Sequence, residues 1–220
     1  MKIFLIGFNK CGTTSIHRYF VANGIRSVHW DKGMLARRIF QNIASGAPLL
    51  TGYESFDAFT DMEWTDERGV YHLEAYKLFP YLAAQYPDAL FILNTRDRES
   101  WIRSRLRQPN YAARARKYHR VTSNEQLADI WRADWDRHHR RVTDFFSAGS
   151  FRFAVCRIET DLPHLLDAAI PEFKLDARLF EIHKVTDARP FFSKWLRLHT
   201  RPLRRSARTV FRRLLPTSWR

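Results

Sequence analysis

The first stretch whose residue types could take part in chemistry is "KIFLIGFNKCGTTS", near the start of the chain. An apolar run stops at Gly7, a loop with a lysine follows, and small and hydroxyl residues then open a helical pattern. Backbone N–H groups in such a turn and at a helix start bind anions, and hydroxyl side chains there add donors. We therefore predict a phosphate site formed by Lys10, Cys11, Gly12, Thr13, Thr14 and Ser15.

The lysine of this loop is not where a nucleoside triphosphatase has it. The spacing from Gly7 to Gly12 is G-x-x-x-x-G, but Thr13 follows where Lys would stand, and the lysine lies inside the loop as Lys10. The lysine that reaches β/γ-phosphates and the magnesium-binding hydroxyl are thus missing. The loop suits a terminal phosphate better than a triphosphate with its metal. An ordinary strand–turn–helix capped by Thr is the alternative.

A second candidate phosphate group lies after the apolar run "ALFILNT". Arg96 ends that run, and Ser104 stands eight residues later in a helical pattern. An arginine at the carboxyl end of a parallel strand lies where open α/β sheets bind ligands. A guanidinium offers a charge-assisted fork to a phosphate, and a serine adds a short hydrogen bond. A solvated arginine beside a surface serine is the alternative.

The elements that must position these residues alternate between strand and helix. Strands are expected at 2–8, 27–30, 48–53, 89–95 and 151–158, of which 2–8 and 89–95 read as buried. Helices are expected at 13–23, 34–45, 71–86, 98–107 and 124–146. Pro80 should kink or divide the third helix, and 108–123 is expected to be a long, mobile connection. This alternation predicts an α/β fold of three layers with a central, mainly parallel sheet and a P-loop-like strand–loop–helix.

At the two phosphate stretches the sequence resembles the sulfotransferases that use 3′-phosphoadenosine 5′-phosphosulfate (PAPS). Their 5′-phosphosulfate loop reads like "KCGTTS", and their 3′-phosphate motif has the spacing of Arg96 and Ser104. "DAFTDMEW" and "YPDALFILNTRDRESW" resemble a bacterial-type branch, and the similarity runs from residue 2 to about 105, then more weakly through "FAVCRIETDL". The resemblance implies in-line transfer of a sulfuryl group from PAPS, without a metal, to an acceptor hydroxyl on a carbohydrate, lipid or small molecule.

The sequence departs from that family in two places. The late K-G-x-x-G-x-W segment of cytosolic members is missing, and "IHKVTDAR", with Lys184 and Arg189, is the only substitute. The histidine motif of members that act on steroids and phenols is also missing, which leaves the acceptor open. Acceptor pockets in such folds come from variable loops, expected here at 31–70 and 106–125.

The resemblance also implies roles in catalysis. Lys10 would neutralise charge that grows on the oxygen between sulfur and the 5′-phosphate. A general base must take the proton of the acceptor, and the similar branch places an acidic residue at Asp61. The candidates are, in order, Asp61, Glu63 and His29, with Glu54 and Asp57 in the same acidic segment.

Other side chains have expected roles outside the chemistry. The field of the helix N-terminus is expected to lower the pKa of Cys11, so that an alkylating reagent would block the loop. His138 and His139 are adjacent on a helix, so they face different directions and are expected at the surface. Trp101, Trp131 and Trp135 are expected in the core.

The charge of the chain is uneven. Of a net charge of +14, ten Arg or Lys without any Asp or Glu fall in 188–220, which leaves +4 for 1–187. We therefore expect a sulfotransferase-like domain at 1–187 and a basic amphipathic tail at 188–220. The tail suits an anionic membrane surface, docking on an acidic patch, or disorder. With two distant cysteines, no leader pattern and no long apolar run, the sequence predicts a cytoplasmic protein without a disulfide framework or zinc site. If the tail binds a membrane, the protein is expected to be peripheral at its inner face.

Two rival functions share some of these sequence features. A P-loop kinase of nucleosides or small molecules would share the strand–loop–helix, but the missing G-K-[ST] argues against it. A nucleic-acid-binding module would suit the basic composition, but most of the excess charge lies in the tail.

Overall fold

The computed structural model describes residues 1–160 and 162–182, and a parallel sheet forms their centre. Its five strands have the order β2-β3-β1-β6-β7, and each neighbouring pair is parallel. The strands are β1 (Ile3–Leu5), β2 (Ser27–His29), β3 (Ala58–Thr60), β6 (Leu90–Thr95) and β7 (Arg152–Arg157). The predicted α/β fold with a mainly parallel sheet is confirmed.

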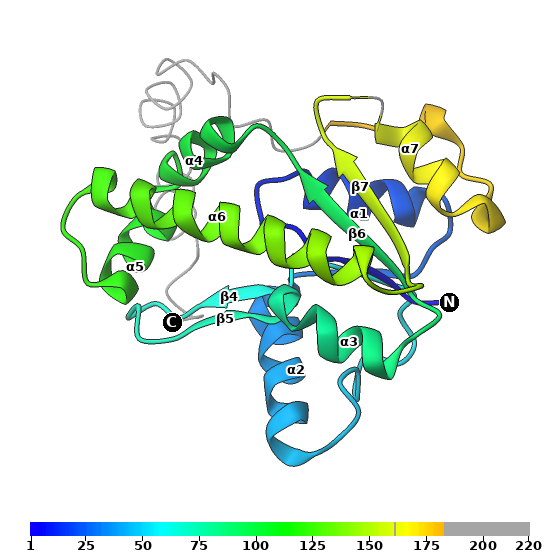
Figure 1. The fold of residues 1–220 in the computed structure, drawn as a ribbon, viewed down its shortest axis with the longest axis horizontal. Coiled ribbons are helices and arrows are strands. Elements are labelled where there is room, and N and C mark those ends of the chain that lie inside the picture. Colours follow the sequence, from blue (N-terminus) through cyan, green and yellow to red (C-terminus); the bar gives the residue numbers. More distant parts are fainter. Residues whose placement is uncertain (161, 183–220) are drawn as a thin grey trace, which may run out of the picture. The chain divides into compact units, whose positions relative to one another are not determined.

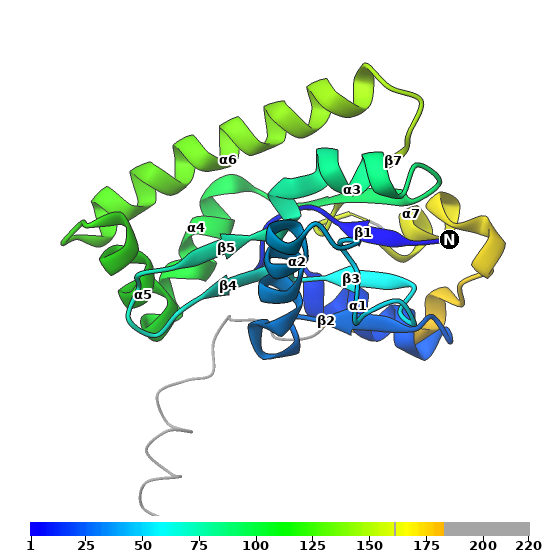
Figure 2. The same ribbon diagram turned by 90° about the horizontal axis from the view of Figure 1, so that it is seen from below.

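Helices cover both faces of this sheet, which makes three layers (Figure 1, Figure 2). On one face lie α1 (Thr13–Ala22) and α7 (Leu162–Ala169), and on the other lie α3 (Phe79–Gln85) and α6 (Asn124–Ser147). The alternating side chains of β1 divide the core accordingly. Ile3 and Leu5 pack with α1 and α7, whereas Phe4 packs with α3 and α6.

The remaining helices and a hairpin gather around the carboxyl end of the sheet. They are α2 (Met34–Ser45), α4 (Arg98–Leu106), α5 (Pro109–His119) and the antiparallel hairpin of β4 (Glu63–Thr65) and β5 (His72–Glu74). Short 3-10 turns lie at Asp31–Gly33, Ala75–Leu78, Pro171–Phe173 and Ala177–Leu179. α2 matches its predicted bounds and ends at Gly46, whose φ of 70° forms the usual left-handed cap.

Three predicted segments are wrong. Residues 108–123 are mostly helix α5, not a long connection. The apolar run at 48–53 forms turns, with Thr51 N bonded to Pro48 O, because the amides of Leu49 and Leu50 donate to the side chains of Gln85 and Tyr86 and not to a strand. The helix expected at 71–86 begins only at α3, with Pro80 in its first turn, where proline needs no N–H partner.

The predicted domain boundary after residue 187, the predicted tail at 188–220, Lys184 and Arg189 lie outside the described residues. Within the described ranges, every helix is too short or too polar to cross a membrane.

Candidate functional site

Four of the predicted residues, Lys10, His29, Asp61 and Arg96, lie at one edge of the sheet. All five strands are parallel, so their carboxyl ends share this edge. Lys10 lies in the loop after β1, and His29 ends β2. Asp61 directly follows β3, and Arg96 directly follows β6.

The loop after β1 is fastened to β6 through one buried asparagine. The amide N–H of Gly7 donates to Oδ1 of Asn94 at 2.9 Å. Nδ2 of Asn94 donates in turn to the carbonyl oxygens of Cys11 at 3.0 Å and Phe8 at 3.3 Å. A Cβ at Gly7 would lie 1.9 Å from the carbonyl oxygen of Asn94, so only glycine fits there.

Side chains from β6 and α4 engage the other loop carbonyls. Nε1 of Trp101 donates to the Asn9 carbonyl at 3.0 Å, and Nη1 of Arg96 donates to the Lys10 carbonyl at 3.2 Å. The carbonyl oxygens of 8–11, which would repel an anion, are thus all held by donors. Lys10 itself adopts a left-handed backbone with φ 64°.

The start of α1 offers donors to an anion. Its N-cap is Gly12, at φ 75°, which has no side chain to cap the first turn. Backbone N–H groups of a first helical turn have no partner within the helix, and the positive end of the helix dipole lies there. This turn carries Thr13, Thr14 and Ser15. The chemistry of the loop and helix therefore fits a phosphate group.

Arg96 contacts this loop directly. Besides its bond to Lys10, its Nε lies 3.7 Å from Oε1 of Glu159 and is buried without a hydrogen-bond partner among the described residues. Ser104 is buried in the next helix, α4, with 6% of its surface exposed. The arginine is therefore placed beside the loop, and the serine stands on the helix that also supplies Trp101.

Asp61 and His29 form a second polar group at the same edge. Oδ2 of Asp61 lies 3.8 Å from Nε2 of His29, and that nitrogen lies 3.3 Å from Oγ1 of Thr14 in the first turn of α1. Nδ1 of His29 is 2.9 Å from Oγ1 of Thr60 at the end of β3. His29 therefore connects the helix of the phosphate loop with the carboxylate of Asp61.

Glu63, the second candidate for the base, lies in a buried network of hydrogen bonds. It is 3% exposed, and its oxygens accept hydrogen bonds from Arg105 at 2.9 Å, His72 at 3.1 Å and the Tyr111 hydroxyl. Burial by itself would raise the pKa of Glu63, but the Arg105 charge and the bonds from His72 and Tyr111 outweigh it and hold this pKa at about 2. A carboxylate that holds its proton so weakly is a poor proton acceptor.

Two other acidic candidates lie away from the edge. Asp57 precedes β3, at the amino end of the sheet, and is paired with Arg26 at 2.8 Å. Glu54 accepts a hydrogen bond from the Gly52 amide in an exposed turn. Of the predicted acidic residues, Asp61 is the one beside the loop helix.

Two expectations about cysteine and histidine are wrong. Cys11 is fully buried, and burial raises the pKa of its thiol instead of lowering it. His138 is only 1% exposed and donates from Nε2 to the Ile6 carbonyl at 2.7 Å. His139 is partly buried, with Nε2 at 2.8 Å from Oγ1 of Thr95 at the end of β6. The tryptophans at 101, 131 and 135 lie in the core, as predicted.

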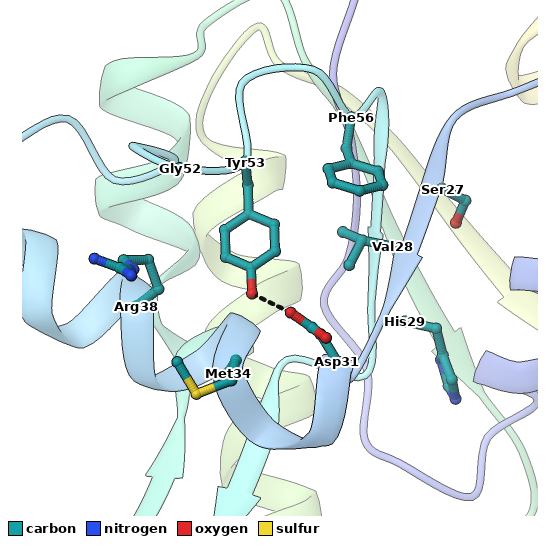
Figure 3. Close-up of a pocket in the computed structure, with 9 residues that line it drawn as sticks. All are labelled: Ser27, Val28, His29, Asp31, Met34, Arg38, Gly52, Tyr53 and Phe56. Carbon is teal, nitrogen blue, oxygen red and sulfur yellow. Dashed lines mark hydrogen bonds between the residues drawn. The ribbon is translucent and has the colours of Figure 1, made fainter.

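An open pocket of about 540 Å³ flanks β2, α2 and the segment 52–56 (Figure 3). The Tyr53 hydroxyl donates to Oδ2 of Asp31 at 2.5 Å within it. Val28 points toward Tyr53 and Phe56, whereas His29 points to the other side of the strand. The full lining is Ser27, Val28, His29, Asp31, Met34, Arg38, Gly52, Tyr53 and Phe56. Most of this pocket is thus separated from the His29 ring by β2.

A family model described as a sulfotransferase domain matches residues 2–171 of the chain. The chain belongs to the sulfotransferase family. The match starts at β1 and reaches past α7, so this sulfotransferase resembles its family well beyond residue 105, where the motif resemblance weakens. No curated protein matches the chain. Within the described part of this sulfotransferase, no cluster of three or more His, Cys, Asp or Glu is placed to hold a metal ion.

Proposed function

We propose that this sulfotransferase takes its sulfuryl group from PAPS and transfers it to an acceptor hydroxyl. The observation that carries the proposal is the loop after β1, whose carbonyls are held by Asn94, Trp101 and Arg96. Such a loop suits the 5′-phosphate of the donor, bound by Lys10 and the amides and hydroxyls of 12–15. Arg96 and Ser104 would bind the 3′-phosphate, the feature that separates PAPS from plain adenosine nucleotides.

The chemistry needs charge stabilisation and a proton acceptor. A bond forms between the acceptor oxygen and sulfur, and the bond between sulfur and the 5′-phosphate oxygen breaks. Lys10 and the helix N-terminus stabilise the negative charge left on that oxygen. Asp61 takes the acceptor proton, and His29 orients Asp61 and Thr14, which lie on either side of it. The acceptor class remains a hydroxyl on a carbohydrate, lipid or small molecule.

The donor site can be tested by calorimetric titration with adenosine 3′,5′-bisphosphate in the absence of magnesium. The full chain should bind it more tightly than AMP, and Arg96→Ala should weaken binding by about 100-fold because a charge-assisted contact to phosphate is lost. Arg103→Ala is the matched control, since Arg103 lies on α4 with its side chain 60% exposed. Binding of ATP with magnesium but not of the bisphosphate would instead favour a kinase.

The role of Asp61 can be tested apart from donor binding. Asp61→Asn keeps the shape of the side chain but removes the basic oxygen. With an acceptor that supports turnover, we expect kcat to fall by about 10²–10⁴-fold, the usual contribution of a general base. The dissociation constant for the bisphosphate should stay within about twofold of the wild type. A variant with near-normal kcat would exclude Asp61 as the base.

A further inference from the structure

One buried guanidinium joins the donor loop to the segment that carries Asp61. Arg105, on α4, is only 1% exposed. Its Nε donates to Oδ1 of Asn9 at 2.8 Å, and its Nη2 donates to Oε2 of Glu63 at 2.9 Å. Asn9 directly precedes Lys10, and Glu63 follows Asp61 by two residues. Lys10 and Asp61, the two residues proposed to take part in the transfer, are thus neighbours of the two ends of the contact series Asn9–Arg105–Glu63.

Aromatic rings fix the orientation of this guanidinium. Its Cζ lies 4.5 Å from the ring centre of Trp101, 5.1 Å from those of Tyr111 and Trp131, and 5.5 Å from that of Phe8. These rings come from α4, α5, α6 and the loop, which gather with the β4–β5 hairpin on the same side of the molecule (Figure 1, Figure 2). A planar fork held between ring faces cannot turn without losing one of its bonds.

Glu63, at the other end of this series of contacts, is also held in place. The other oxygen of Glu63 accepts from His72 and Tyr111. The Met62 carbonyl accepts from the Ala75 amide at 2.9 Å, and Asp61 has φ 56°. The hairpin therefore fixes the backbone of residues 61–63, and Arg105 links this segment to the donor loop.

Stability alone does not require this arrangement. A buried ion pair can often be replaced by apolar residues of similar volume without loss of stability, because burial of both charges offsets much of their attraction. What an apolar replacement would lack is two directional bonds at a fixed angle.

We propose that Arg105 is a positioning residue for sulfuryl transfer, which holds the Lys10 loop and the Asp61 segment in one fixed geometry. This rests on the proposed function. Arg105 acts through Asn9 on the loop and through Glu63 on the acid segment, and it touches no reacting atom.

The test compares two variants that cut the link with one that does not. Asn9→Ala removes the loop end but leaves the Arg105–Glu63 pair and the Trp101 bond to the residue 9 carbonyl. Arg105→Lys keeps the charge but cannot make both bonds of the fork. Tyr111→Phe removes a different bond to Glu63 and leaves the link to Asn9 intact. The dissociation constant for adenosine 3′,5′-bisphosphate is measured by calorimetry, and the folded fraction by near-ultraviolet circular dichroism.

We expect Asn9→Ala and Arg105→Lys each to weaken bisphosphate binding by about 10-fold, the effect of one charge-assisted hydrogen bond. The double variant should be no weaker than either single one, because both remove the same bond. Tyr111→Phe should bind like the wild type. The inference is overturned if folded Asn9→Ala binds like the wild type, or if Tyr111→Phe loses as much affinity as Asn9→Ala. Wild-type protein that ignores the bisphosphate would refute the donor assignment itself, which is a separate outcome.

Discussion

His138 makes the stability of the fold depend on pH in a way that can be calculated. Its ring is buried against Phe8, Tyr76 and Phe79, and Nδ1 has no hydrogen-bond partner within the described residues. Burial lowers the pKa of His138 from 6.5 to about 3, against a smaller opposite effect of its bond to Ile6. The folded protein therefore holds this imidazole neutral, whereas the unfolded chain protonates it below pH 6.5.

The sign and size of the effect follow from proton linkage. The unfolded state binds more protons than the folded state between pH 6.5 and 3, so stability is full above pH 6.5 and falls as the pH falls. At 1.36 kcal/mol per pH unit, this group removes about 2 kcal/mol by pH 5 and about 4 kcal/mol by pH 3. That is a large part of the roughly 5–15 kcal/mol that holds an ordinary domain together.

The experiment measures urea unfolding at pH 5, 6 and 7 by tryptophan fluorescence. His138→Gln can still donate to the Ile6 carbonyl but does not titrate, so its stability should change by about 2 kcal/mol less than that of the wild type over this range. His164→Gln, at an exposed position on α7, should follow the wild type. Equal pH dependence in the wild type and His138→Gln would refute the reasoning. The variants are compared with one another because His72 also titrates in the wild type. The pKa of His72 is raised, so its protonation stabilises the folded state at low pH, opposite to the effect of His138.

Three further outcomes are expected. Gly7→Ala should lower the free energy of unfolding by about 2 kcal/mol or more, measured by urea titration, because its Cβ would overlap the Asn94 carbonyl. Cys11 should react with iodoacetamide only as fast as the protein unfolds, which mass spectrometry of the labelled peptide can follow; rapid labelling in native buffer would contradict its burial. Glu63→Gln should lower stability at pH 7 by about 3–5 kcal/mol, seen in thermal unfolding, because it leaves the Arg105 charge buried without its partner. The control Asp136→Asn disrupts an exposed pair and should cost less than about 1 kcal/mol.

The parts of the fold that the sequence predicts well are those with strong local signals. β1 and β6 are apolar runs long enough to be buried on both faces, and α2 lies between two glycines with left-handed backbones. The run at 48–53 has the same apolar character as a strand. It forms turns because its leucines are buried beside α2 and α3, an arrangement set by tertiary packing.

The sequence indicates which residues belong to the candidate site, but not the hydrogen bonds that hold them in place. Lys10 and Arg96 stand out by type and by position after a strand. Asn94 and Arg105, which hold the loop, look like ordinary strand and helix residues until the chain is folded. The burial of His138 could have been predicted from the sequence, since it lies on the same face of its helix as Trp131 and Trp135.

Lys10 and Asp61 share a feature with a consequence for laboratory evolution. Both have left-handed backbones, at φ 64° and 56°, where a residue other than glycine costs about 1 kcal/mol or more. A library selected only for heat resistance should therefore enrich glycine at these two positions, whereas one selected for turnover should restore lysine and aspartate. At Asn94, which holds the loop together, the two selections should favour the same residue. Opposite preferences in paired selections would thus mark, position by position, where this chain gives up stability to keep a side chain in place.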